Sequence, residues 1–146
     1  MNMATPFTEI YARAIFRFAD YKFLEQDTDV REGVLEKYLI SAKTEFQRIS
    51  KVDLNDYDLE LKQFNQDLGD EVIEILSLGV AFYWLSYKTM NSELLKNVLN
   101  SKDYYFYSPA NLLKEIQTLR KTLRDEFNSR MRQYSFFDNT LDTLKN

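Results

Sequence analysis

The sequence predicts an all-α protein, a single-domain helical bundle arranged around one buried central helix. Apolar residues recur at helical spacing through most of the chain, and only three glycines and two prolines interrupt it. In residues 68–87 the apolar residues fall on every side of a helical wheel. A helix of this kind is packed by neighbours on several faces, so we expect the other helices to surround it.

This central stretch is too short to cross a membrane. Its uninterrupted apolar part, residues 75–85, is well below the ~20 residues that a transmembrane helix needs. Two acidic residues, Glu71 and Glu74, also lie close to its start. We therefore expect no membrane partner.

Two helices are predicted before the central one. Thr5 followed by Pro6 is a typical helix start, and the first helix should end near Asp20. Asp29 is the expected cap of the second helix, which spans about residues 30–49. The core stripes of the two helices are Phe7, Ile10, Tyr11, Ala14, Ile15 and Phe18, and Val34, Leu35, Tyr38, Leu39, Ala42, Phe46 and Ile49.

Residues 50–66 lose the helical period, and their apolar residues are spaced closer to two. This pattern allows a short extended segment or hairpin, or an ordered loop packed on the bundle; we favour a loop with an extended stretch near residues 58–62. The region continues as an acidic one into the central helix. Its acids are Asp53, Asp56, Asp58, Glu60, Asp67, Asp70, Glu71 and Glu74, opposed only by Lys51 and Lys62. Many of them could equally be turn formers or helix caps.

The C-terminal third should contain a short helix that starts at residues 91–93 and ends at 100–103, an aromatic cluster at 104–107 and a long helix at about 109–134. That last helix would be ~39 Å long, more than the ~30 Å diameter of a small domain, so part of it should overhang or lie against another subunit. Residues 1–134 would form the helical domain. Residues 135–146, with Phe136 and Phe137, would form a flexible tail that is disordered or weakly helical on its own. Its two adjacent phenylalanines suggest that it docks on its own bundle or, as we favour, on a partner.

Composition excludes several kinds of chemistry. The chain has no cysteine and no histidine, which removes Cys/His zinc sites, thiol catalysis and histidine acid–base catalysis. Glu71 and Glu74 share one helix face, but a carboxylate-metal site of the bundle type would pair such residues with histidines. We therefore expect no enzyme activity and no cofactor. The N-terminus also lacks the pattern of a signal peptide, so the chain should stay where it is made.

Basic residues on the last helix are interleaved with acids, and the net charge of the chain is −4. This favours a solvated helix face over a nucleic-acid interface. The acidic 53–74 region and the basic last helix could instead meet across neighbouring subunits of a head-to-tail ring. That hypothesis fails if the two regions neutralise each other within one subunit.

Three strings in order, FNQDLGDEVIEILSLGVAFYWL, MNSELLKNVLNSKDYYFYSPANLLKEIQTLRKTLRDEF and RMRQYSF, resemble the head–tail connector (neck adaptor) proteins of tailed bacteriophages. The similarity covers roughly residues 61–136. It implies an all-helical subunit that forms a ring, typically of twelve copies, beneath the portal and extends the DNA channel toward the tail. The subunit would act in the virion neck after assembly in the host cytoplasm.

The resemblance also implies partners and candidate residues. The partners are other copies of the chain, the portal protein, the next neck or tail protein, and genomic DNA that passes through the channel without sequence-specific binding. Catalytic residues and cofactors are not expected. The candidates for portal docking are Tyr134, Phe136, Phe137 and Leu141. The candidates for inter-subunit or channel surfaces are Asp53, Asp56, Asp58, Glu60, Arg120, Arg124 and Arg130.

One alternative of another class is a small helical regulatory or nucleic-acid-binding module. It would need a compact helix–turn–helix with a basic recognition helix, and the sequence has no short turn followed by such a helix. A carboxylate-metal enzyme is disfavoured by the missing histidines.

Overall fold

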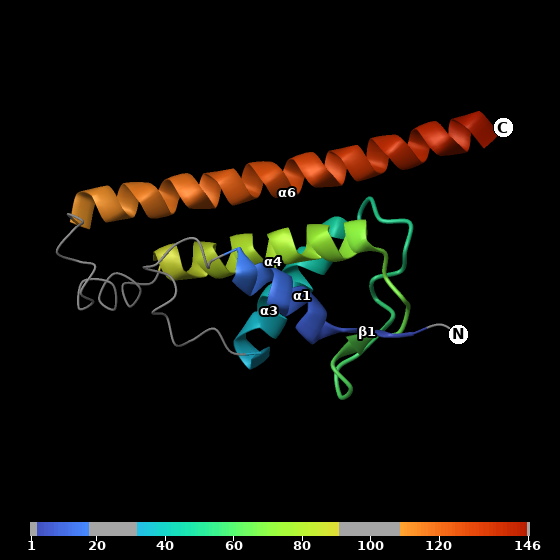
Figure 1. Ribbon diagram of the computed structural model, residues 1–146, viewed down its shortest axis with the longest axis horizontal. Coiled ribbons are helices and arrows are strands. Elements are labelled where there is room, and N and C mark those ends of the chain that lie inside the picture. The colour runs from blue at the N-terminus through green and yellow to red at the C-terminus, as the bar shows by residue number, and fades with distance from the viewer. Residues whose placement is uncertain (1–2, 18–31, 91–108, 146) are drawn as a thin grey trace.

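The computed structural model describes residues 3–17, 32–90 and 109–145, the side chains of 32, 88–90, 109–113 and 138–145 excepted. The described part is mostly helical, as the sequence predicts (Figure 1). Its elements are β1 (Thr5–Pro6), α1 (Phe7–Phe16), α3 (Glu32–Phe46), β2 (Tyr57–Asp58), β3 (Gln63–Phe64), α4 (Asp70–Met90) and α6 (Pro109–Lys145).

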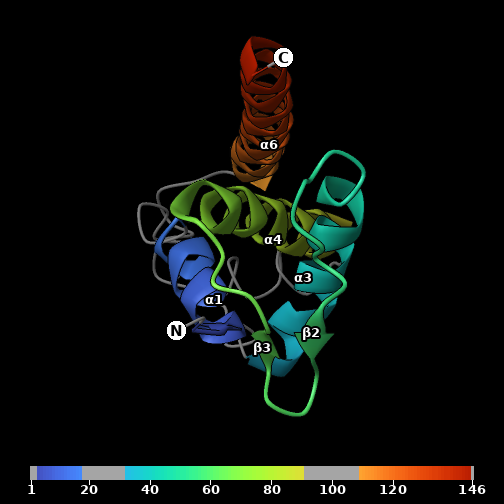
Figure 2. The ribbon, with the colours of Figure 1, turned by 90° about the vertical axis from the view of Figure 1, so that its right-hand side faces the viewer.

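Helix α4 lies in the middle of the structure, with α1, α3 and α6 packed against it (Figures 1 and 2). Its position matches the predicted central helix within three residues at either end. Apolar side chains on all of its faces are buried because each face meets a different neighbour. The fully buried ones are Ile75, Leu76, Leu78, Val80, Ala81, Trp84 and Leu85.

A glycine allows this close packing. A Cβ atom added at Gly79 would come within 2.5 Å of the Ala42 Cβ on α3 and 2.9 Å of the Phe127 ring on α6. Both distances are too short for carbon atoms in contact. Helices α3 and α6 therefore approach α4 at this point only because residue 79 has no side chain.

The expectation of an all-α fold is wrong in one respect, because the chain also forms a small antiparallel sheet in the order β1-β3-β2. Thr5 pairs with Phe64, and Tyr57 pairs with the same Phe64 from the other side. Of the conformations that the sequence allowed for this region, residues 57–64 therefore adopt the hairpin. The extended stretch favoured near residues 58–62 is wrong, because residues 59–62 form the turn and Asp58 Oδ1 accepts hydrogen bonds from the amides of Glu60 and Leu61.

Thr5 does not cap α1, contrary to the prediction from its sequence. Helix α1 begins after Pro6 without a side-chain cap. The Thr5 hydroxyl instead donates to the Gln66 carbonyl oxygen at 2.8 Å and accepts from the Leu68 amide at 2.9 Å. The strand β1 and the segment that leads into α4 are therefore joined by one buried hydroxyl group.

The other boundaries differ modestly from the predicted ones. Helix α3 ends at Phe46, whereas the prediction continued it to Ile49, and residues 47–49 form a turn. Three predicted features lie outside the described residues: the end of the first helix near Asp20, the short helix that starts at residues 91–93, and the aromatic cluster at 104–107.

Helix α6 is longer than predicted. It continues to Lys145, so residues 135–145 are helical where the sequence suggested that the helix would stop at about 134 and a flexible tail would follow. These residues contain neither glycine nor proline, and Phe137, Leu141 and Leu144 keep the helical spacing of the preceding stripe. At 37 residues the helix is ~55 Å long and extends well past the start of α4 (Figure 1).

Candidate functional site

The structure offers no metal site or membrane helix in the regions that it describes. No group of three or more Asp and Glu side chains there is arranged to hold a metal ion. None of the four described helices is both long and apolar enough to cross a membrane. The features with functional potential are the end of α6, the charged residues along it, and the acidic loop between α3 and α4.

The end of α6 separates into a buried and an exposed part at Tyr134. The Tyr134 ring packs edge-on against Phe46 at 5.1 Å, and its hydroxyl oxygen accepts a hydrogen bond from the Lys51 amide at 3.3 Å. Tyr134 is therefore a core residue. Phe136 and Phe137, by contrast, are 75% and 61% exposed, which is unusual for two adjacent phenylalanines. Leu141 belongs to α6, but its side chain lies outside the described residues.

A groove of about 560 Å³ lies between α3 and the C-terminal half of α6. Its apolar lining comes from Ile49, Met131 and Phe136, and Arg48 and Arg132 stand at its exposed edges. The full lining is Glu45, Arg48, Ile49, Asn128, Met131, Arg132, Ser135 and Phe136. The exposed Phe136 is thus part of a larger surface that also includes the end of α3.

Arg124, a predicted inter-subunit residue, is engaged within the subunit. It donates to both carboxylate oxygens of Glu45 on α3, and Glu45 also accepts a hydrogen bond from the Tyr83 hydroxyl on α4. We call Glu45, Tyr83 and Arg124 the polar clamp. The hydrogen bond from Arg124 lowers the pKa of Glu45, and burial, followed by the bond to Glu45, raises the pKa of Tyr83.

Two arginines of α6, Arg120 and Arg124, also contact aromatic rings. The Arg124 guanidinium carbon lies 5.1 Å from the centre of the Phe82 ring and 5.6 Å from that of Phe127. Arg120 lies 5.6 Å from the Phe82 ring centre and donates from Nε to the Ser86 hydroxyl at 3.0 Å. Of the three arginines predicted for inter-subunit or channel surfaces, Arg130 alone has no such contact with a side chain of α4 in the described regions.

The acidic loop residues mostly shape their own loop. Asp53 Oδ1 accepts from the Asn55 amide, and Asp56 accepts from the Asn65 side chain. Asp58 forms the hairpin turn described above, and Glu60 is exposed at its tip. Within the described ranges, no ion pair joins these four acids to α6. The sequence interpretation of many of these acids as turn formers agrees with the structure.

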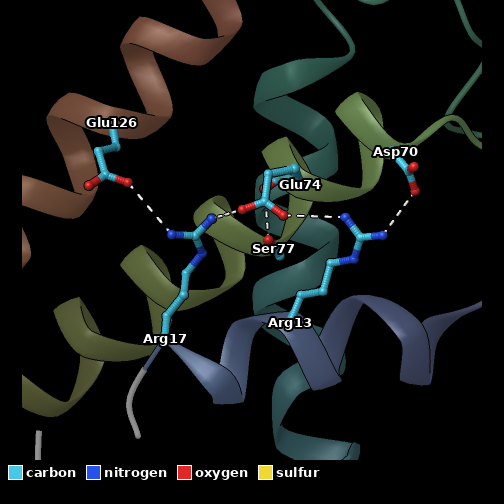
Figure 3. Close-up of polar contacts among 6 residues, drawn as sticks. All are labelled: Arg13, Arg17, Asp70, Glu74, Ser77 and Glu126. Atoms are coloured by element: carbon cyan, nitrogen blue, oxygen red, sulfur yellow. Dashed lines mark hydrogen bonds and ion pairs between the residues drawn. The ribbon is translucent and has the colours of Figure 1, made fainter. Parts of the chain in front are cut away.

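A second ionic cluster, the arginine network, joins α1 to α4 and α6 (Figure 3). Arg13 contacts Asp70 at 3.0 Å and Glu74 at 3.3 Å, and Arg17 contacts Glu74 and, at 3.6 Å, Glu126. Burial lowers the pKa of Arg17, Glu126 opposes this shift, and the nearby Arg130 adds to it. The network therefore pairs Asp70 and Glu74 within the subunit with arginines at α1 rather than with the basic residues of α6.

The sequence analysis did not identify the arginine network or the polar clamp. Arg13 and Arg17 are four residues apart beside the α1 stripe, and Glu74 interrupts an apolar helix. Both are local signals of a partly buried ion pair. Glu45 and Arg124 carry no such signal, because they are 79 positions apart in the chain.

Comparisons of the chain with protein-family models, with curated proteins and with solved structures found no match. A functional assignment therefore depends on the sequence resemblance and on the surface geometry of α6.

Proposed function

We propose that this chain is a structural subunit of the neck of a tailed bacteriophage, where it forms a ring that joins the portal to the tail. It would act without catalysis or cofactor, as a helical domain with a projecting docking helix. The observation that carries the proposal is the projecting end of α6, residues 135–145, which we call the α6 overhang. It extends past the start of α4 and begins with two exposed phenylalanines (Figure 1).

The overhang has the properties expected of a docking element. Two large exposed apolar side chains in sequence cost free energy in water and mark an interaction surface more often than isolated ones do. Aromatic residues also dominate the binding energy of many protein interfaces. In the ring, Phe136 and Phe137 would enter apolar sites on the portal, with Leu141 one helical turn further along the same helix.

The charged surfaces fit a channel subunit once Arg124 is removed from the residues assigned to subunit contacts. Asp53, Asp56, Asp58 and Glu60 lie in the segment between α3 and α4, which includes the hairpin, and form no ion pair with α6 in the described ranges. They would supply a negative surface that lets DNA slide without adhering. Arg120 and Arg130 remain candidates for contact with a neighbouring subunit. Arg124 is best assigned to the polar clamp, because its guanidinium group already binds Glu45.

The proposal is tested by replacing both exposed phenylalanines, F136D with F137D. Both side chains are exposed, so we expect the free energy of unfolding to change by less than about 0.5 kcal/mol. Binding to the portal protein from the same source should weaken at least about 100-fold, as expected when two central aromatic contacts are lost. Binding is measured by surface plasmon resonance.

A matched control carries the same chemical change elsewhere. Leu59 and Leu61 in the hairpin turn are 48% and 66% exposed, so L59D with L61D adds two charges at another exposed apolar pair. This control should bind the portal like the original protein. Unchanged portal binding by the phenylalanine variant would refute the docking role of the overhang.

A further inference from the structure

The groove between α3 and α6 has an apolar floor with positive charge at its edges. Ile49 and Met131 belong to the floor, and Arg48 and Arg132 flank it. Both arginines are exposed, and neither forms an ion pair within the described residues. Glu45, which also lines the groove, is held by the polar clamp. A partner that fits this groove therefore presents apolar side chains next to carboxylates.

The turn between β2 and β3, residues 58–61, has that complementary pattern, and we call it the hairpin tip. Leu59 and Leu61 are 48% and 66% exposed. Glu60 lies between them, exposed and without an ion pair in the part of the chain that the structure describes. Lys62, the basic residue that follows, already forms an ion pair with α3 at 2.9 Å. The hairpin tip thus combines leucines with acids where the groove combines apolar residues with arginines.

Hydrogen bonds give the hairpin tip a fixed shape. Asp58 Oδ1 accepts from the amides of Glu60 and Leu61 at 2.8 and 3.0 Å. At the end of the turn, the Lys62 carbonyl oxygen accepts from the Phe7 amide at 2.9 Å. Because the leucines are already ordered, their docking costs less conformational entropy than the docking of a loose loop would.

The hairpin tip and the groove lie at opposite ends of the subunit. In two views at right angles, the turn between β2 and β3 lies at the bottom of the molecule, and α6, which forms one wall of the groove, lies at the top (Figures 1 and 2). The tip of one copy therefore cannot reach its own groove. We propose that the hairpin tip of each copy docks in the groove of the next copy, with both leucines on the apolar floor and the two acids facing the two arginines.

A contact of this kind joins two different surfaces, so it is heterologous and closes into a ring or continues as a filament. Surfaces at opposite ends suit a ring of many subunits, because each added copy then turns the row by only a small angle. As the contact of the neck ring the inference rests on the proposed function, whereas head-to-tail association itself does not.

The contact divides surfaces that the neck role had grouped together. Asp58 and Glu60 belong to the subunit interface, and Asp53 and Asp56 remain for the channel. Helix α6 runs across the line from tip to groove, so the overhang beyond Phe136, which lines the groove, projects clear of the contact (Figure 1). A subunit in the ring can therefore still present the overhang to the portal.

Sedimentation velocity of the purified full chain, without the portal, tests the contact. We expect species larger than a dimer to grow as the concentration rises through the micromolar range, because every added copy offers a new tip or groove. L59S with L61S removes the apolar part of the tip, and R132E with S135E places two acids in the groove. Each of these two variants should weaken association at least about tenfold.

Matched controls carry the same chemical changes at exposed positions outside both surfaces. I15S with F16S removes another exposed apolar pair, at the end of α1. T118E with K121E makes the same pair of changes on α6, also three residues apart. Both controls should associate like the original protein, and circular dichroism establishes that every variant is folded.

A mixture of the two disabled variants is the sharpest test. The tip variant keeps an intact groove and the groove variant keeps an intact tip, so together they should form a pair of about 35 kDa, twice the 17.4 kDa of the chain, and nothing larger. A symmetric contact would not respond in this way. A chain that stays monomeric throughout the micromolar range, association that neither variant weakens, or a mixture that forms no pair would each overturn the inference.

Portal binding distinguishes failure of this inference from failure of the neck assignment. Head-to-tail association of a chain that ignores the portal would support the contact and contradict the neck role. Assembly on the portal that both disabled variants perform like the original protein would do the reverse.

Discussion

At the scale of single residues, the carboxylate of Glu45 has the largest structural role that the sequence did not reveal. It accepts hydrogen bonds from Tyr83 on α4 and from both terminal nitrogens of Arg124 on α6. One side chain on α3 therefore connects three helices through charge-assisted hydrogen bonds, which are stronger than neutral ones. Its removal should affect both stability and the dependence of stability on pH.

The pH prediction follows from the lowered pKa of Glu45. Arg124 holds this pKa below the value of about 4.3 in the unfolded chain, so the ionised clamp stabilises the fold above that pH. The contribution should disappear as the pH falls through the folded-state pKa. Chemical denaturation from pH 6 to pH 3 should give a steeper loss of unfolding free energy for the original protein than for E45Q. Identical slopes for the two proteins would contradict the prediction.

Gly79 gives a second prediction at this scale. Glycine to alanine in a helix normally gains up to about 1 kcal/mol, but here the added Cβ would overlap with Ala42 and Phe127. Ala42 cannot move away without its backbone, so we expect G79A to destabilise the protein by about 1–3 kcal/mol. G33A is the control: Gly33 is helical with open space around it, and this variant should be neutral or more stable. Thermal and urea denaturation measure both, and a stabilising G79A would show that the packing is looser than described.

At the scale of elements, the sequence predicts the parts that depend on local pattern. The stripes of the helices and the apolar surround of α4 are local patterns, and most of the described stripe residues are buried as predicted. Ile15 is the exception: it was predicted to lie in the core stripe of the first helix, but it is 42% exposed near the end of α1. The sheet could not be predicted in the same way, because β1 pairs with a strand almost sixty residues away. A two-residue strand also has too few positions to display a period.

Thr5 illustrates this limit. Followed by proline, it has the local pattern of a cap, but the hydroxyl binds Gln66 and Leu68 because the sheet brings these residues close. T5V keeps the shape of the side chain but leaves the buried Leu68 amide and the half-buried Gln66 carbonyl without this partner. We expect a loss of about 1–3 kcal/mol in unfolding free energy, measured by urea denaturation.

The control for this prediction is T8V, because Thr8 is exposed on α1. That change should stay within about 0.5 kcal/mol. Equal effects of the two variants would mean that the Thr5 hydroxyl does not join β1 to the start of α4.

The candidate site could be predicted from sequence only where it depends on local pattern and not on contacts between distant helices. Phe136 and Phe137 stand out in the sequence and are exposed in the structure, and their docking role stays a prediction. The length of α6 was underestimated because the polar residues between Phe137 and Leu144 obscure the continuing stripe. The engagement of Arg124 required knowledge of which helices meet, so its assignment to a subunit interface could not be corrected from sequence.

At the scale of the whole molecule, the polar clamp, the arginine network and the overhang together describe how α6 is attached and how far it projects. The polar clamp fixes α6 to α3 and α4, and the arginine network (Figure 3) connects it to α1. The overhang projects beyond the start of α4 (Figure 1). The acidic loop forms a separate surface with no ion pair to α6 in the described ranges. A rigid domain with one projecting apolar helix and one acidic face suits a subunit that binds a neighbour while tolerating DNA.

The most direct test of the neck assignment is the mass in solution, measured by light scattering, of the chain alone and after mixing with the portal from the same source. The assignment predicts that the portal assembles a ring, with about twelve copies adding about 210 kDa for a chain of 17.4 kDa. A chain whose mass is unchanged by the portal, and which instead binds duplex DNA with an affinity that falls steeply with salt, would contradict the assignment and favour a regulatory protein.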